Sequence, residues 1–446
     1  MTRRLIVAIV RFSLRVYFRQ IEVVGLEHVP LKTPVIFVLN HPNALVDPVF
    51  LLCLAPRRVS FLAKAPLFRM PILGSFVRAL DSLPVYRRQD EGEDVARNNE
   101  TFQAARRLLA RGGTIGICPE GVSHNEPRLR PIKTGAARIA LGAISTGEVR
   151  DLKIIPAGLY YTAKTMFRSE ALLYFGAAID VTPSEVDSEG NPPRAAVREL
   201  SEKIESALRA VIFDAEHEEA LHTISRAERI FSSETKGDGE SLAAELQLLQ
   251  RFGKAYAVLR ENAPERLRKL EVRMIRFEEE LRQARVDPEE LMPPGSTLEV
   301  FFHLLTRSTV FTLLALPAVL GALIHYPAYR LGGYLATRFS QASDDVISTI
   351  KIVSAMLLFP LTWLGLAIIG YELIGWVGPA LAFLAAPGLG YLAIIFFEAI
   401  DKFLGGLRAL SFFLMKRRFY VRLLAERKAI RHEILALGEE VVLATR

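Results

Sequence analysis

Short apolar runs alternate with longer stretches of helical periodicity between Ile21 and Val181. The runs predicted as strands are Val35–Leu39, Val59–Ala63, Leu83–Tyr86, Thr114–Cys118, Ile154–Tyr160 and Leu172–Gly176. The stretches predicted as helices are Pro48–Leu54, Leu67–Leu80, Glu93–Arg111 and Gly135–Ile144. Several of the strands are continuously apolar, which is typical of strands with helices on both faces of the sheet. The pattern therefore predicts an α/β domain over residues 21–193, with a mixed sheet covered by helices.

The next region, residues 194–292, is charged and has helical spacing throughout. The helices predicted there are Arg194–Ala215, Glu218–Phe231, Ser241–Asn262 and Pro264–Val286. Residues 233–239 are polar and glycine-rich and predict a flexible break. We interpret the region as an antiparallel helical insert. A spacer, a dimer contact and a partner surface are all open as its function.

Hydrophobicity rises sharply in residues 293–410. Val310–Ile324 with its flanks, Ile352–Ile369 and Leu373–Ile400 are each candidates to cross a bilayer. Prolines and glycines interrupt the last segment, so it predicts either one tilted span or a hairpin of two short helices. Residues 411–446 form a basic tail, and positive segments stay cytoplasmic. With the α/β domain also cytoplasmic, the number of crossings should be even, either two or four. A buried soluble helical core is the alternative.

The first 20 residues begin with Arg3 and Arg4, followed by the apolar run Leu5–Val10. This start is similar to a signal peptide. Arg11 and Arg15 interrupt it, however, and no small-residue cleavage site follows. The segment therefore predicts an amphipathic helix that lies on the membrane surface.

Composition supports a protein with separate soluble and membrane parts. Half of the 446 residues are hydrophobic, 24% are charged and the net charge is +7. Such a basic balance suits nucleic acid, an anionic membrane or a phosphorylated substrate, and the long apolar segments favour the membrane. The two cysteines, Cys53 and Cys118, are too few for a disulfide framework and indicate a reducing compartment.

The first candidate site residues lie in the block Asn40–Pro48, directly after the predicted strand Val35–Leu39. Reactive groups in open α/β sheets lie beyond the carboxyl ends of strands, where His41 stands. A neutral imidazole can take a proton from an alcohol near neutral pH. A carboxylate such as Asp47 on its other ring nitrogen would fix the tautomer. If this block stood alone, a helix-capping Asp47 and a packed His41 would be the preferred reading.

Two further strand ends carry candidate chemistry. The block Ser82–Arg88 ends in two arginines, and an arginine side chain can bind a phosphate through two parallel hydrogen bonds. The block Ile115–Ser123 runs into Pro-Glu-Gly, where Gly121 permits a tight turn and Glu120 could bind substrate hydroxyls. Lys133 follows, just before a predicted helix whose free N–H groups suit a phosphate. A later strand contains Pro156, for which a strand start or edge is as good a reading as ligand contact.

Taken in order, these blocks resemble the lysophospholipid/glycerol-phosphate acyltransferase family over roughly residues 21–180. That family has an Asn-His-xxxx-Asp block, a block ending in Arg, a Pro-Glu-Gly-x-Ser block and a late proline block. In this chain five residues separate His41 from Asp47, where the common pattern has four. The His-Pro-Asn start with the longer gap resembles the branch that includes fungal-type glycerol-3-phosphate acyltransferases.

The resemblance implies acyl transfer from acyl-CoA or acyl-carrier protein to 1-acyl-glycerol 3-phosphate or glycerol 3-phosphate, in phosphatidic acid and phospholipid synthesis. It implies that His41 is the general base and Asp47 its orienting partner, and that Pro156 shapes the acyl side. The substrate-binding residues that it implies are Arg87, Glu120, Gly121, Ser123 and Lys133. No cofactor or metal is expected. The expected partners are membrane lipids, the acyl donor and the glycerol-phosphate acceptor, without nucleic acid; a homo-oligomer is an open alternative.

Two other function classes compete with this interpretation. Ser123 and His124 could belong to a lipid hydrolase, but Asn125 stands where a Gly-x-Ser-x-Gly motif needs its second glycine. Neighbouring side chains also rarely meet as nucleophile and base. A non-catalytic membrane scaffold would explain the apolar segments and the helical insert, but not the polar residues at successive strand ends.

Overall fold

The computed structural model describes residues 2–90, 92–187, 190–215, 217–233, 241–291, 297–340 and 343–444. The chain divides into two compact units. The first unit contains Met1–His217, Ser241–Leu246 and Ser340–Ile352, and the second contains Glu218–Glu240, Gln247–Phe339 and Val353–Arg446. Most of the break predicted at residues 233–239 lies outside the described residues.

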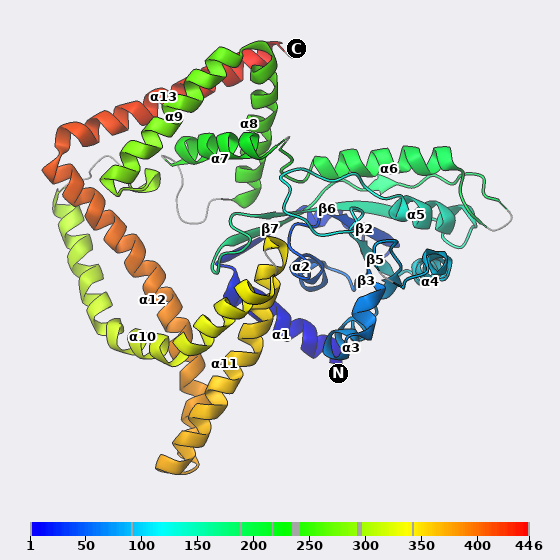
Figure 1. The fold of residues 1–446 in the computed structure, drawn as a ribbon, viewed down its shortest axis with the longest axis horizontal. Coiled ribbons are helices and arrows are strands. Elements are labelled where there is room, and N and C mark those ends of the chain that lie inside the picture. The colour runs from blue at the N-terminus through cyan, green and yellow to red at the C-terminus, as the bar shows by residue number, and fades with distance from the viewer. Residues whose placement is uncertain are drawn as a thin grey trace. The chain divides into compact units, whose positions relative to one another are not determined.

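A mixed sheet forms the centre of the first unit (Figure 1). Its strands among the described residues are β1 (Gln20–Val24), β2 (Val35–Leu39), β3 (Ser60–Lys64), β4 (Leu83–Val85), β5 (Thr114–Ile117), β6 (Lys153–Tyr161), β7 (Glu170–Phe175) and β8 (Ile179–Asp180). They lie in the order β1-β7-β6-β2-β5-β3-β4, with β8 beside β6. The central strands β6, β2, β5, β3 and β4 are parallel, whereas β7 and β8 are antiparallel to β6. The carboxyl ends of the parallel strands therefore meet at one edge.

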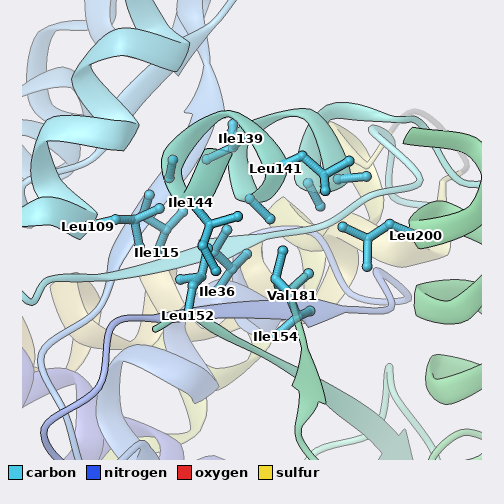
Figure 2. Close-up of a cluster of buried hydrophobic side chains, with 14 of the residues drawn as sticks. Ile36, Leu109, Ile115, Ile139, Leu141, Ile144, Leu152, Ile154, Val181 and Leu200 are labelled. Atoms are coloured by element: carbon cyan, nitrogen blue, oxygen red, sulfur yellow. The ribbon is translucent and has the colours of Figure 1, made fainter. Parts of the chain in front are cut away.

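Helices cover both faces of this sheet. In the first unit they are α1 (Thr2–Tyr17), α2 (Val46–Leu54), α3 (Pro71–Ala79), α4 (Asn98–Ala110), α5 (Gly135–Ser145) and α6 (Arg194–Arg209), with short 3-10 helices η1 (Leu26–His28), η2 (Ala65–Arg69) and η3 (Val95–Arg97). Figure 2 shows the core on one face, where Ile36 and Ile115 from the strands pack against Leu109 of α4, Ile139 of α5 and Leu200 of α6. The sequence pattern grouped α6 with the charged helices, but its apolar side packs on the sheet.

The opposite face is built from aromatic side chains and carries α1 and α2. Phe18 stacks edge-on against Phe50 of α2, and Phe50 contacts Tyr161 at the end of β6. Leu14 buries one side of α1 in this layer. A helix is therefore present where one was predicted, and one of its faces packs on the protein. Its position on a membrane surface stays a prediction.

The expected fold class is confirmed, and each predicted strand lies within two residues of an observed one. The pattern missed β1 and β8. It also merged elements: the helix predicted over Leu67–Leu80 is η2 followed by α3, because Pro71 starts a new helix. The helix predicted over Glu93–Arg111 begins as α4 only at Asn98.

Charged helices form part of the second unit: α7 (Glu218–Ser232), most of α8 (Leu242–Asn262), α9 (Pro264–Ala284), η4 (Pro288–Glu290) and α13 (Arg417–Ala444). The buried residues of α9 recur at heptad spacing: Leu267, Leu270, Met274, Phe277 and Leu281. Those of α13 do the same: Tyr420, Leu423, Arg427, Ile430, Ile434 and Leu437. Such seams pack helix against helix, so the segment that the sequence suggested as a basic tail is a packed helix.

Three helices in the described part of the chain are long and apolar enough to cross a membrane. They are α10 (Thr297–Phe339), α11 (Asp344–Ile374) and α12 (Val377–Met415), with mean hydropathies of 1.8, 2.3 and 2.1 over their most apolar windows. The expected apolar region is confirmed. From Val377 on, its last segment lies in one continuous helix that passes through Pro387, and not in a hairpin of two short helices.

Candidate active site

His41 and Asp47 meet at the carboxyl end of β2. His41 follows the strand by two residues, and Asp47 lies in the first turn of α2. The Nδ1 atom of His41 lies 2.9 Å from Oδ2 of Asp47. Asp47 has no exposed surface, and it also accepts hydrogen bonds from the Asn43 N–H at 2.6 Å and the Tyr161 hydroxyl at 2.7 Å. Because Asp47 acts as an acceptor towards all of them, Nδ1 carries the proton and Nε2 is the basic nitrogen.

A tight turn accommodates the longer spacing between His41 and Asp47. Ala44 has a positive φ of 32°. The carbonyl of Asn43 accepts hydrogen bonds from the N–H groups of Val46, at 2.9 Å, and Asp47, at 3.3 Å. The extra residue is thus absorbed before α2 begins, and the contact between the two side chains is kept.

The environment of His41 changes its proton affinity. Burial alone lowers the pKa of His41, but the Cys118 sulfur and the Asp47 carboxylate outweigh it and hold that pKa well above 6.5. Burial, together with Asp47, also raises the pKa of Tyr161 well above 10. Tyr161 therefore stays a neutral hydroxyl and a steady donor to Asp47.

Hydrogen bonds of the Glu120 side chain connect the loop after β5 to the loop after β2. Its Oε1 accepts a hydrogen bond from the His41 N–H at 2.9 Å. Its Oε2 contacts Nε2 of His124 and accepts a hydrogen bond from the Arg130 N–H at 3.0 Å. The main chains are joined as well, because the His124 N–H donates to the His41 carbonyl at 3.2 Å. Glu120 is thus largely engaged in holding His41 in place.

Arg87, Gly121 and Lys133 come together beside this loop. Arg87 donates to both carboxylate oxygens of Asp90, at 2.8 and 2.6 Å, and to the Gly121 carbonyl at 2.7 Å. Gly121 has a φ of 76°, and a Cβ added there would lie 2.5 Å from Nζ of Lys133. The positive φ favours glycine at this position, and the Lys133 side chain lies over the turn.

The other predicted residues have structural contacts of their own. The hydroxyl of Ser123 donates to Asp345 at the start of α11. Pro156 is buried inside β6 and pairs with Val38, one residue before the end of β2. The structure thus brings His41, Asp47 and Glu120 into one network, and Arg87, Gly121 and Lys133 into a second that the Gly121 loop joins to it.

Sequence reasoning missed several residues around His41. Tyr161 ends an apolar strand and belongs to no motif. Asp345 lies over 200 residues from Ser123, between two of the predicted membrane spans. Asn43 belongs to the His-Pro-Asn start of the first block and His124 follows Ser123, but neither was assigned a role in acyl transfer. The Nδ1 atom of His124 and the Oδ1 atom of Asn43 are buried without a hydrogen-bond partner among the described residues. Buried polar atoms of this kind mark positions where a ligand or water can bind.

Two family profiles match this chain. Residues 20–160 match the family Acyltransferase, and residues 223–441 match the Glycerol-3-phosphate acyltransferase 2 C-terminal domain. The first match contains every candidate site residue from His41 to Lys133. The chain therefore combines a region similar to the Acyltransferase family with a region similar to the C-terminal domain of glycerol-3-phosphate acyltransferase 2.

The curated relatives that this chain resembles are acyltransferases by name. Glycerol-3-phosphate O-acyltransferase 2 of Saccharomyces cerevisiae is 26% identical over 61% of this chain and 38% of its own length. An uncharacterized acyltransferase of Schizosaccharomyces pombe is 23% identical over 78% of this chain and 65% of its own length. The 1-acyl-sn-glycerol-3-phosphate acyltransferase of Borreliella burgdorferi is 30% identical over 35% of this chain and 57% of its own length. The chain thus spans between about two fifths and two thirds of these relatives.

Proposed function

We propose that this chain transfers a fatty acyl group from acyl-CoA or acyl-carrier protein to the free hydroxyl of glycerol 3-phosphate or 1-acyl-glycerol 3-phosphate, in phospholipid synthesis. The observation that carries the proposal is the His41–Asp47 pair at the carboxyl edge of the sheet, in which Asp47 contacts Nδ1 of His41. The match of residues 223–441 to a glycerol-3-phosphate acyltransferase domain favours glycerol 3-phosphate as the acceptor.

In this proposal His41 acts as the general base. Its Nε2 atom takes the proton of the acceptor hydroxyl as the oxygen attacks the thioester carbonyl. Asp47 stabilises the imidazolium that forms, and Asn43 and Tyr161 hold Asp47 in place. The new ester bond forms as the carbon–sulfur bond breaks, and His41 returns the proton to the leaving thiolate. This sequence of steps needs no covalent acyl-enzyme, cofactor or metal.

The phosphate of the acceptor would bind at Arg87 and Lys133. A guanidinium has five N–H donors, and Arg87 uses three of them for Asp90 and Gly121. Further donors are therefore available to a phosphate without loss of the Gly121 contact. Lys133 adds a second cation over the Gly121 turn. Ser123 would complete this group from the same loop.

The apolar helices would place the site at a membrane surface, where lysolipids and lipid products partition. The exposed stripe of α1, formed by Leu5, Ile9 and Phe12, would lie on the same surface. The basic residues after α12 favour a cytoplasmic position for the α/β domain.

The contacts of Ser123 do not favour the hydrolase alternative. A serine nucleophile needs a base within hydrogen-bond reach. In this chain Ser123 donates to Asp345, and the neighbouring His124 contacts Glu120. The two side chains are thus directed to different partners.

The proposal is tested with the purified chain in lipid nanodiscs, by supplying labelled acyl-CoA with each acceptor and identifying the lipid formed. The acceptors are glycerol 3-phosphate, 1-acyl-glycerol 3-phosphate and dihydroxyacetone phosphate. We expect a phosphate-containing lipid, and we expect His41→Ala to lower kcat by about 10²–10⁴-fold, the usual contribution of a general base. His222→Ala removes an exposed histidine of α7 and serves as the matched control. Normal turnover by His41→Ala, or no lipid product with any acceptor, would refute the proposal.

A further inference from the structure

The first turns of α11 belong to the first unit, although the rest of this apolar helix belongs to the second. The described residues of this stretch, 343–352, pack with the α/β domain. Asp345, Ser348 and Lys351 are spaced by three residues, which places them along one side of a helix. This side of α11 carries polar groups in a helix that is otherwise apolar enough to span a membrane.

Asp345 holds the loop after β5. It is 4% exposed, and it accepts hydrogen bonds from the hydroxyls of Ser123 and of Ser343 in its own turn. Ser123 lies two residues after Gly121, in the turn that Arg87 and Lys133 contact. Asp345 therefore fixes one end of the loop that carries the candidate phosphate-binding groups.

Ser348 and Lys351 hold the turn after β6. The Ser348 hydroxyl donates to the Lys164 carbonyl and accepts a hydrogen bond from the Tyr17 hydroxyl at 3.0 Å. Lys351 donates to the Thr165 carbonyl at 2.7 Å. Ser348 has no exposed surface, so this contact is a packed one.

The turn after β6 also contacts the loops that carry His41 and Ser123. The Lys164 carbonyl also accepts a hydrogen bond from the Asn43 side chain at 3.5 Å. The Lys164 ammonium donates to the Pro42 carbonyl at 3.4 Å and to Asn125 at 2.6 Å. Burial lowers the pKa of Lys164, while nearby carboxylates that include Asp345 and Asp47 oppose this effect. The loops after β2, β5 and β6 are thus linked to the start of α11.

We propose that Asp345 is a positioning residue of the acyltransferase site, and that the start of α11 joins an apolar helix directly to the loop that binds the acceptor phosphate. This inference rests on the proposed function. Asp345 acts through Ser123. This contact sets the position of the Gly121 turn, and the turn in turn sets the position of the bound phosphate relative to His41. The position that α11 takes in a membrane then determines the geometry of the acceptor site.

The test compares Asp345→Ala, Asp345→Asn, Ser123→Ala and the double variant Asp345→Ala/Ser123→Ala in nanodiscs. We expect Asp345→Ala to raise the acceptor KM by about 10–100-fold, the range for one lost hydrogen bond to a charged group, and to leave the thioester KM unchanged. Asparagine keeps an oxygen that can accept from Ser123, so Asp345→Asn should restore most of the acceptor affinity. The acceptor KM of the double variant should rise no more than that of the more affected single variant, because both changes break the same contact.

The matched control is Asp344→Ala, which removes an exposed carboxylate from the same helix turn. It should leave both KM values unchanged. Hydrogen exchange of residues 119–125 is measured in parallel and should be faster in Asp345→Ala than in Asp344→Ala. Equal acceptor KM and equal exchange in these two variants would overturn the inference. If the wild type makes no lipid, the proposed function fails. The exchange measurement still tests whether Asp345 holds the loop of Ser123 in place.

Discussion

At the scale of single residues, His41 touches two buried carboxylates that act on different parts of it. Asp47 contacts the ring, so it determines which nitrogen is basic. Glu120 accepts from the main-chain N–H of His41, so it determines where the ring stands. Because Glu120 also contacts His124 and Arg130, the position of His41 depends on the loop that carries the phosphate-binding candidates.

The raised pKa of His41 predicts how activity depends on pH. A general base works in its neutral form, so kcat/KM should rise with pH through a midpoint above 6.5. Cys118 is one cause of the raised pKa, and Cys118→Ala should therefore move the midpoint to lower pH. Burial raises the pKa of Cys53 to about 11, so that thiol stays neutral, and Cys53→Ala serves as the control. The measurement is kcat/KM from pH 5 to 9; superimposed wild-type and Cys118→Ala curves would contradict this account.

Arg87 and Asp90 predict opposite effects on acceptor binding. Arg87→Ala should raise the acceptor KM by about 10–100-fold and leave the thioester KM unchanged, because it removes a charged donor. The Asp90 carboxylate competes with a phosphate for the same guanidinium, so Asp90→Asn should lower the acceptor KM by about two- to fivefold. The controls are Arg88→Ala and Asp94→Asn, which change exposed neighbours of the same charge. A higher acceptor KM in Asp90→Asn would show that Asp90 orients Arg87 and does not compete with substrate.

Sequence reasoning at this scale succeeds where contacts are local. His41 and Asp47 are six residues apart, and a turn followed by a helix brings them together, so their contact could be predicted. Tyr161 reaches Asp47 only because β6 pairs with β2, a pairing that no local pattern specifies. Asp345 reaches Ser123 across 222 positions and from an apolar helix, where its charge looks like a simple helix-start preference.

At the scale of elements, the paired helices α9 and α13 lie alongside each other in the second unit (Figure 1). Their ion pairs are Arg266–Glu440 at 2.6 Å, Arg273–Glu433 at 2.7 Å, Arg273–Glu426 at 2.6 Å and Glu280–Arg422 at 2.8 Å. Partner numbers fall along α13 as they rise along α9, so the helices are antiparallel. Exposed ion pairs of this kind contribute little each, and the apolar seam supplies most of the stability.

The α9 seam predicts which side chains stabilise this unit. Met274 is fully buried, and Met274→Ala should lower the free energy of unfolding by about 2–5 kcal/mol, since it leaves a cavity. The neighbouring Ile275 is 50% exposed, and Ile275→Ala should change it by less than about 0.5 kcal/mol. Thermal unfolding of the detergent-solubilised chain, followed by circular dichroism, compares the two. Equal midpoints would show that the seam does not hold the unit together.

Element prediction failed where the pattern was weak or the packing was long-range. The edge strand β1 reads Gln-Ile-Glu-Val-Val, and its polar residues and partial burial hide it from an apolar-run criterion. The helix α6 has a charged face like those of α7 and α9, so its sequence could not show that its apolar side covers the sheet. The central strands were found because burial on both faces makes them continuously apolar.

At the scale of the whole molecule, chain connectivity limits how the apolar helices can cross a membrane. Among the described residues before Thr297 no helix is long and apolar enough to span a membrane, and we expect α9 to lie on the same face of the membrane as the α/β domain. Because α13 pairs with α9, we expect α13 on that face too, and the number of crossings between them would then be even. We also expect α11 to begin on that face, since its start packs with the first unit.

We predict from these constraints that α11 and α12 cross as a pair, whereas α10, a single helix that contains Pro317 and Pro327, stays on one face. The expectation is tested by placing cysteines at exposed positions and labelling sealed vesicles with a membrane-impermeant maleimide. Arg338→Cys at the end of α10 and Lys416→Cys after α12 should react from the same side, the cytoplasmic one. Trp376→Cys, between α11 and α12, should react only from the opposite side. Labelling of Arg338→Cys and Lys416→Cys from different sides would mean that α10 spans the membrane and that the start of α11 cannot reach Ser123.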